Sequence, residues 1–476
     1  MTDVCFLTAL ELRAALGAGE LSAREVVRAH LDRIDQVNPE VNAIVTLVAD
    51  RALAEAEAAD ERAAAGAELP PLHGIPAAHK DLHDTAGIRT TYGSPRYADH
   101  VPDRDALIIE RMRAAGVISL GKTNVPEFGA GSHTFNPVFG VTRNPYHSGK
   151  SAGGSSGGAA VALACGMCPV ADGSDTGGSL RNPASFNNVV GFRPSPGRVP
   201  DWPTALGWST LGVSGPMART VADAALLLSV IAGPDPRSPI ALEEPGSGFA
   251  RPLDIDPRGL RVAWSPDLGG AVPVEGEVVA VVEQAARVFS DLGCEVERAC
   301  PDFTGAEEVF RTLRAWQFEV AFSPLLDTGR LKESIRWNTR AGRALTGPDL
   351  GRAEVRHTEL FHRVREFFTR YDFLLLPVSQ VPPFDLDLEY PTEVAGVPME
   401  TYLDWMRSAY FVSATGCPAL SVPAGFTPGG LPVGVQIVGP HRADFAVLQA
   451  GHVFEQATGF GRRRPGALPV AEPGRE

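Results

Sequence analysis

Residues 151–158 read Ser-Ala-Gly-Gly-Ser-Ser-Gly-Gly and lead directly into the apolar run AAVALACGM at 159–167. A Gly/Ser stretch without such a neighbour is typical of a flexible linker. The apolar run predicts a helix over 157–165, so the glycines stand at a helix N-terminus. There they allow close backbone approach beside N–H groups and a positive dipole. We therefore expect a packed turn at the start of a helix rather than a linker.

The sequence around this turn, from 71 to 220, alternates short apolar segments with glycine-rich turns and helical segments. Strands are predicted at 75–78, 117–120 and 169–171, and a further helix at 106–115. Such alternation indicates an α/β sheet with helices on both faces.

The flanking regions extend the same pattern. Residues 1–66 predict helices: Ser22 and Glu25 form a capping-box pattern, and the alanine-rich segment 50–65 ends at Gly66. A Pro/Gly-rich passage at 233–257 predicts a long surface connection. Because the same element types continue beyond it, we expect one α/β domain with a mixed sheet surrounded by helices. The further elements predicted there are strands at 260–264, 373–376, 419–422 and 433–438 and helices at 278–292 and 443–456.

The composition of the chain indicates which binding partners and which cellular compartment to expect. The chain has 43 basic and 57 acidic residues, a formal charge of −14, and no dense Lys/Arg run. This argues against nucleic acid or an anionic membrane surface as a direct partner. No apolar run reaches the roughly 18 residues that span a bilayer, and the N-terminus lacks signal-peptide character. Six cysteines are too sparse for a disulfide scaffold, so we expect a cytoplasmic protein, with Cys165 and Cys168 as buried structural thiols.

A second glycine-rich motif, Asp175-Thr-Gly-Gly-Ser-Leu-Arg181, places a serine 24 residues after Ser155. Its two glycines precede Ser179, and consecutive backbone N–H groups in such a turn can form an anion-binding nest. A serine at the end of the nest lies where acyl transfer develops an oxyanion. Ser179 is therefore the candidate nucleophile, with an ordinary turn serine as the alternative.

A nucleophilic serine needs a base. None of the eleven histidines lies in a recognisable triad motif. The other candidate is a lysine held neutral by burial. Lys80 follows the short apolar strand in His73-Gly-Ile-Pro-Ala-Ala-His-Lys-Asp81, although most lysines are solvated surface charges.

Several motifs keep a fixed order through residues 71–220, and two more lie near the C-terminus. Together they resemble the amidase signature family. The resemblance implies an amidase domain over 1–476, with N-terminal helices in 1–70, the signature catalytic region in 71–220, and 221–476 completing the sheet and the substrate pocket. The motifs are Gly74-Ile-Pro76 with Lys80-Asp81, Gly121-Lys-Thr-Asn124, Asn144-Pro145, 151–158, 175–181, Gly191-Phe-Arg-Pro194, 417–423 and 430–436.

The resemblance implies a Ser–cis-Ser–Lys triad. Ser179 is the acylated serine, Ser155 the bridging serine after a cis peptide bond, and Lys80 the base, with no metal or organic cofactor. Backbone N–H groups around Ser179 are expected to stabilise the oxyanion, and Gly129 to present its carbonyl to the substrate. The expected oxyanion residues besides Ser179 are Thr176, Gly177 and Gly178, and the expected supporting residues are Ser156, which orients Lys80, Asp175 and Arg181.

Two other motif matches fit their usual contexts poorly. Residues 116–123 fit the P-loop pattern, but a P-loop needs a strand before its first glycine and a helix after its threonine, and here the predicted order is reversed. The segment His79-Lys-Asp-Leu-His83 resembles H-E-x-x-H with lysine in place of the glutamate, so a zinc site is not expected. Both histidines are predicted to be loop or pocket-wall residues.

The sequence therefore predicts an amide hydrolase acting on a small molecule, and it leaves a homodimer open. The alternative within the family is the glutaminase A subunit of a tRNA-dependent amidotransferase. Two segments depart from what that branch leads us to expect: His-Thr-Phe-Asn-Pro after Gly131-Ser132, and VPDWPTALGWSTLGVSGPMAR after Arg198. A catalytically inactive or nucleotide-binding scaffold is the alternative of another class. Four C-terminal aromatic residues are predicted to be core residues, with a pocket role as the alternative: Trp316, Trp337, Tyr402 and Trp405.

Overall fold

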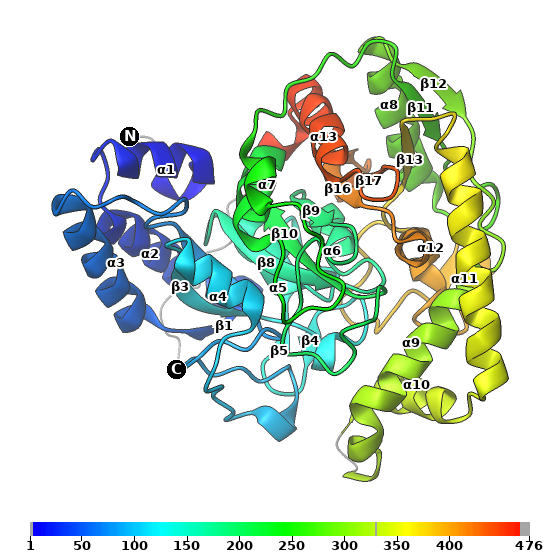
Figure 1. The fold of residues 1–476 in the computed structure, drawn as a ribbon, viewed down its shortest axis with the longest axis horizontal. Coiled ribbons are helices and arrows are strands. Elements are labelled where there is room, and N and C mark those ends of the chain that lie inside the picture. The colour runs from blue at the N-terminus through cyan, green and yellow to red at the C-terminus, as the bar shows by residue number, and fades with distance from the viewer. Residues whose placement is uncertain (1–2, 329–330, 467–476) are drawn as a thin grey trace.

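An eleven-stranded mixed sheet runs through the molecule in the order β1-β3-β2-β8-β10-β9-β16-β17-β13-β11-β12 (Figure 1). The computed structural model describes residues 3–328 and 331–466. The two halves of the chain join where β9 pairs with β16, which confirms one sheet in one α/β domain. The strands are β1 (Ile44–Leu47), β2 (Pro76–Lys80), β3 (Ile118–Thr123), β8 (Val170–Asp175), β9 (Val190–Arg193), β10 (Val213–Ala218), β11 (Arg261–Trp264), β12 (Glu295–Arg298), β13 (Phe373–Pro377), β16 (Ala419–Phe426) and β17 (Pro432–Val438).

Helices cover both faces of the sheet. On β16, a side chain at Gly451 of α13 would collide with Leu420, whereas the next residue along the strand, Ser421, lies near Ser185 of α6. Because side chains alternate across a strand, α13 and α6 lie on opposite faces. The helices are α1 (Ala9–Gly17), α2 (Ala23–Val41), α3 (Ala49–Ala64), α4 (Leu107–Ala114), α5 (Gly157–Ala164), α6 (Arg181–Phe186), α7 (Val221–Ile231), α8 (Gly276–Asp291), α9 (Ala306–Phe322), α10 (Glu333–Arg343), α11 (Gly347–Phe367), α12 (Arg407–Thr415) and α13 (Asp444–Thr458).

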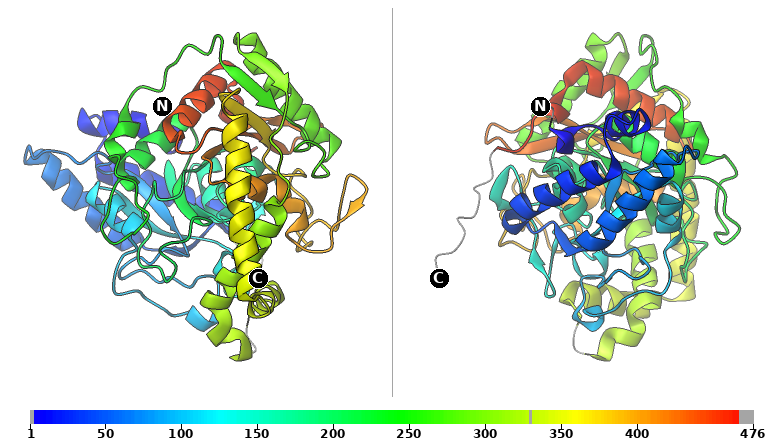
Figure 2. Two further views of the ribbon diagram at one scale, coloured as in Figure 1. Left: turned by 45° about the vertical axis from the view of Figure 1, so that its right-hand side comes forward. Right: turned by 90° about the vertical axis from the view of Figure 1, so that its left-hand side faces the viewer.

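The helices on opposite sides of the molecule come from different parts of the chain. Figure 2 shows α1, α2 and α3 gathered on one side of the molecule, and α9, α10 and α11 on the other. None of the described helices is long and apolar enough to span a bilayer. Short two-stranded ribbons complete the fold: β4 (Phe135–Asn136) with β5 (Gly140–Val141), β6 (Arg143–Asn144) with β7 (His147–Ser151), and β14 (Glu393–Val394) with β15 (Val397–Pro398).

The two strands that carry the predicted site lie side by side. β2 and β8 pair in parallel, with Ala77 opposite Val170 and Ala78 opposite Ala171. Lys80 ends β2 and Asp175 ends β8. Both residues therefore lie at the carboxyl edge of neighbouring parallel strands, the position where open α/β sheets usually bind ligands.

Several local predictions are confirmed. The Ser22 side chain accepts from the N–H of Glu25 and the Glu25 carboxylate accepts in return, so the capping box forms at the start of α2. α3 ends before Gly66, which adopts a positive φ. The helix expected after the glycine-rich turn is α5, and all of its residues are buried.

Other predictions are wrong in detail. Residues 1–66 are not all helical, because β1 pairs with β3 at the edge of the sheet. β8 continues to Asp175, beyond the predicted end at 171, because hydrogen bonds of the site satisfy polar residues that otherwise disfavour strands. Lys80 belongs to β2 rather than following it. No sequence pattern indicated β9, β10 or the helices α9–α11.

Candidate active site

The glycine-rich turn before α5 is closely packed, as its sequence predicts. A side chain on Gly157 would lie 2.3 Å from Thr134 Oγ1, and one on Gly158 would lie 2.3 Å from the backbone nitrogen of Asn124. Only glycine fits at these two positions. The Gly154–Ser155 peptide bond is cis, as the resemblance predicts.

Lys80 points into this turn from the end of β2. Its side chain is fully buried, and Nζ lies 2.9 Å from Ser155 Oγ, 2.7 Å from Ser156 Oγ and 3.0 Å from Ser174 Oγ. Burial lowers the pKa of Lys80 to about 7, although the carboxylates of Asp175 and Asp172 oppose the shift. A substantial neutral fraction near neutral pH gives this amine the character of a base.

Asp175 braces the second glycine-rich turn. Its carboxylate accepts from the N–H groups of Gly178 (2.8 Å) and Leu180 (3.2 Å) and from Arg181 Nε and Nη2 (both 3.0 Å). Arg193 Nη1 also lies 3.2 Å from Asp175 Oδ1. Burial alone would raise the pKa of the Asp175 carboxyl, but the two guanidinium groups hold it well below its usual range. Asp175 and Arg181 thus fix the turn that presents Ser179.

Ser179 joins the site through its backbone. The Ser156 N–H donates to the Ser179 carbonyl at 3.3 Å, which holds the two glycine-rich turns together. Among the described residues, the Ser179 hydroxyl makes no hydrogen bond, whereas the Ser155 hydroxyl contacts Lys80. The structure therefore joins Lys80, Ser155 and Ser156 directly and places Ser179 beside them with its hydroxyl free.

The predicted oxyanion segment is built from residues that admit no larger side chain. A Cβ on Gly177 would meet Phe310 at 2.8 Å, and one on Gly178 would meet Ala409 at 2.6 Å. The Gly178 N–H donates to Asp175, so within residues 3–328 and 331–466 the N–H groups of Thr176, Gly177 and Ser179 are those left without a partner in this turn.

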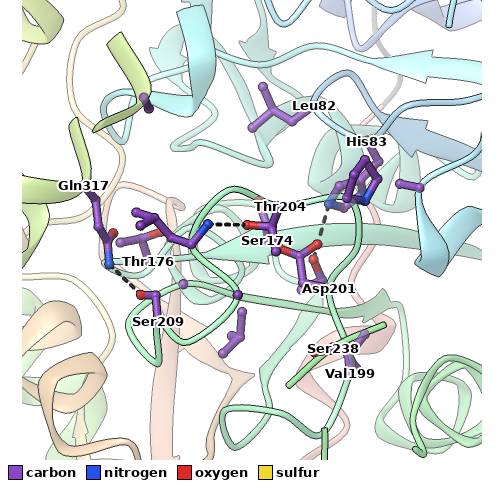
Figure 3. A pocket seen from close by; sticks show the side chains of 18 of the residues that line it. Leu82, His83, Ser174, Thr176, Val199, Asp201, Thr204, Ser209, Ser238 and Gln317 are labelled. Atoms are coloured by element: carbon purple, nitrogen blue, oxygen red, sulfur yellow. Dashed lines mark hydrogen bonds between the residues drawn. The ribbon is translucent and has the colours of Figure 1, made fainter. Parts of the chain in front are cut away.

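Two further predicted residues lie at the border of the site. Gly129 adopts a φ of +70°, and a Cβ placed there would lie 3.4 Å from Ser155 Oγ. Thr176 lies in the wall of the adjoining cavity (Figure 3). The predicted site residues therefore lie in the two glycine-rich turns, at the end of β2 and beside them.

A cavity of about 560 Å³ opens beside the site, and Ser174 and Thr176 form part of its wall (Figure 3). Its volume lies in the range of small-molecule pockets. Gln317 of α9 closes one side and donates to Ser209 at 2.7 Å. The aromatic side chains of the wall come from Tyr92, Phe128, Phe318 and Phe322. None of the four C-terminal aromatic residues considered from the sequence belongs to this wall. Tyr402 and Trp405 are core residues and Trp316 is partly buried, whereas the core prediction is wrong for Trp337, which is 37% exposed.

Asp172, His79 and His83 form a buried hydrogen-bond network beside the cavity, and no sequence pattern predicted it. Asp172 of β8 accepts from His79 Nδ1 at 2.7 Å, from His83 Nδ1 at 2.6 Å and from the Lys80 backbone N–H at 3.1 Å. Burial would raise the pKa of Asp172, but the two histidines hold it well below its usual range. His83 lines the cavity as predicted, whereas the loop or pocket-wall prediction for His79 is wrong, because it is a fully buried strand residue bonded to Ser119.

The other motif matches have structural roles. Residues 118–123 form β3, and the next helical turn begins only at Glu127, so the P-loop pattern lacks its helix. Lys122 within it is buried and donates to the His83 carbonyl and to Thr85 Oγ1.

Burial raises the pKa of the Cys165 and Cys168 thiols to about 12, as expected for structural thiols. Across the part of the chain that the structure describes, no cluster of His, Cys, Asp and Glu has metal-binding geometry.

Comparisons with known proteins find similar sequences and structures over nearly the whole chain. The family model described as Amidase matches residues 25–448. An acylamidase of Rhodococcus erythropolis is 36% identical, over 97% of each chain. The A subunit of a glutamyl-tRNA(Gln) amidotransferase from Moorella thermoacetica is 37% identical, over 97% of this chain and 99% of its own length. The solved structure of a bacterial aryl acylamidase, an amidase signature enzyme, is similar with a TM-score of 0.89 and 30% identity, covering 98% of this chain and 99% of that one.

Proposed function

The chain belongs to the amidase signature family of amide hydrolases, and from this premise we propose that it is a stand-alone amidase that works through an acyl-enzyme on Ser179. The observation that carries the proposal is the contact of buried Lys80 with the Ser155 hydroxyl, at 2.9 Å. A neutral amine in that position can withdraw a proton from one serine while that serine withdraws a proton from the next.

The proposed reaction has two halves. Ser179 Oγ attacks the amide carbonyl as its proton passes to Ser155 Oγ and the Ser155 proton passes to Lys80 Nζ. The backbone N–H groups of Gly177 and Ser179 stabilise the oxyanion. The relay then returns the proton to the leaving nitrogen, the C–N bond breaks, and water releases the acid by the same route. Ser156 and Ser174 hold Lys80 Nζ in line for both halves.

The lining of the cavity favours a stand-alone amidase over a glutaminase subunit. Free glutamine carries an α-carboxylate, which a protein site usually pairs with a cation. The residues that line the cavity include no lysine or arginine within the described chain. The glutaminase subunit stays the second candidate, because amidotransferase A subunits are as similar to this chain as the acylamidase is.

We expect the purified single chain to hydrolyse aryl and small aliphatic amides with a kcat/KM at least about 100-fold above that for glutamine, a difference of about 2.7 kcal/mol in transition-state binding. Ammonia or amine release is measured over a panel of aliphatic, aryl and amino-acid amides. Each assay is run with and without glutamine as competitor. Turnover of glutamine alone, dependent on a partner protein and charged tRNA, would instead identify an amidotransferase subunit.

The pH dependence follows from the base. Because Lys80 acts in its neutral form and its pKa is lowered to about 7, kcat/KM is expected to rise between about pH 6 and 8 and then level off. The midpoint belongs to the coupled triad rather than to one group. Initial rates on one neutral amide across this range test the expectation, and a rate that is independent of pH or highest at pH 6 contradicts it.

A further inference from the structure

The polar part of the cavity wall contains acceptors and no cationic side chain. Its titratable residues are His83, Asp84, Tyr92 and Asp201. The Tyr92 hydroxyl donates to the Asp84 carboxylate, so that acceptor is already used. His83 and Asp201, which lie together in Figure 3, are the acceptor end of the cavity.

Asp172 fixes the orientation of the His83 ring. Both oxygens of the Asp172 carboxylate are occupied, one by His79 and the other by His83 and the Lys80 N–H. An ionised carboxylate only accepts, so His83 donates through Nδ1 and its Nε2 becomes the acceptor in the neutral ring. Nε2 lies 3.4 Å from Ser214 Oγ, a long contact that leaves room for a better donor from the cavity.

Asp201 supplies the second acceptor. Within residues 3–328 and 331–466, its carboxylate takes part in no hydrogen bond or ion pair. Asp201 is an exposed residue of the cavity wall, so its carboxylate is open to a ligand. A cation that arrived beside the carboxylate would favour its ionised form. Asp201 lies in the segment after Arg198, one of the two segments that we expect from the sequence to differ from the amidotransferase branch.

Another part of the wall is aromatic. The rings of Phe128 and Phe322 lie 5.0 Å apart between centroids, and those of Phe318 and Phe322 lie 5.2 Å apart. Phe318 follows Gln317 on α9, and Figure 3 shows Gln317 across the cavity from His83 and Asp201. These three phenylalanines, the aromatic wall, suit the face or edge of a substrate ring.

We propose, on the basis of the proposed amidase function, that the preferred substrate is an aryl amide that carries an ammonium group or another N–H donor. Its ring packs on the aromatic wall, and its donor group binds the Asp201 carboxylate and His83 Nε2. An amide that carries a carboxylate is rejected, because it would meet Asp201 with no cation to compensate. Asp201 is thus the residue that selects the charge of the substrate.

The test measures binding apart from turnover. In Ser179→Ala protein, dissociation constants are measured by calorimetry for phenylacetamides with a 4-methyl, 4-aminomethyl or 4-carboxy substituent, and for the matching acetanilides, which place the substituent on the amine side. In at least one series, the aminomethyl compound is expected to bind about tenfold or more tightly than the carboxy compound. Adding Asp201→Asn is expected to reduce that ratio about tenfold. The matched control is Asp291→Asn, an exposed carboxylate at the end of α8, which should leave the ratio unchanged.

The outcomes separate this inference from the proposed function. A carboxy compound that binds as tightly as its aminomethyl partner in both series overturns the inference, and so does a ratio that Asp201→Asn leaves unchanged or the absence of measurable binding. Hydrolysis of the 4-methyl compounds by the unsubstituted enzyme tests the proposed function alone. Charge-selective binding without that hydrolysis would leave the binding site in place and refute the amidase mechanism.

Discussion

Ser179→Ala and Lys80→Ala are each expected to lower kcat for amide hydrolysis by about 10⁴-fold or more while the protein stays folded. The first removes the attacking oxygen. The second removes the base and leaves the hydroxyls of Ser155, Ser156 and Ser174 without their shared partner. Rates on one good aryl amide, with circular dichroism and thermal unfolding to confirm folding, measure both effects.

Covalent labelling gives an independent readout of the nucleophile. A fluorophosphonate is expected to modify wild-type enzyme at Ser179, with loss of fluoride, and intact mass followed by peptide mapping locates the adduct. The control is Ser148→Ala, because Ser148 is an exposed serine of β7 outside the site. Near-normal turnover by folded Ser179→Ala, or labelling of that variant at the normal rate, would refute the mechanism.

Ser155→Ala is expected to lower kcat by about 10² to 10⁴-fold, because it removes the proton path between Ser179 and Lys80. Ser156→Ala should lower kcat by a smaller factor. Its hydroxyl lies 2.7 Å from Lys80 Nζ, but Ser155 and Ser174 still hold the amine when it is lost. Measuring kcat for both variants on one substrate compares two neighbouring serines in the same turn.

The dependence of the rate on pH distinguishes a serine that relays the proton from a serine that only positions Lys80. Ser156→Ala should shift the acid limb, because it changes the hydrogen bonds to Lys80, whereas Ser155→Ala should lower the plateau. If Ser156→Ala is inactive and Ser155→Ala is nearly normal, the roles of the two serines are reversed.

The chemistry of the site could be predicted from the sequence because its residues lie in short motifs with strong local constraints. The glycines before α5 and before Ser179 mark places where no side chain fits, and such places leave a visible pattern. Lys80 needed the resemblance, since nothing in its local sequence says that the strand bearing it is buried. Its role as the base stays a prediction that the variants above test.

The surroundings of the site could not be predicted in the same way. Asp172 and the two histidines lie about 90 residues apart, and only the parallel pairing of β2 with β8 brings them together. Phe318 and Phe322 belong to α9, whose amphipathic pattern does not reveal which neighbour it faces. β1 has only four residues and lies between two helices, so its run of apolar residues is too short to be told apart from the helical segments around it.

Because α9 lies across the cavity from the end of β2, the residues of the proposed catalytic relay and part of the residues that line the cavity come from different segments of the chain. Lys80 and both serines of the proposed relay come from β2 and the two glycine-rich turns, whereas Gln317 and two of the wall phenylalanines come from a helix more than 120 residues later. Mutations of Gln317, Phe318 or Phe322 can change which amide fits, because none of these three residues contacts Lys80 or the serines bonded to it. In evolutionary terms, such a protein can acquire new substrates by drift in one segment of its gene while purifying selection preserves the other.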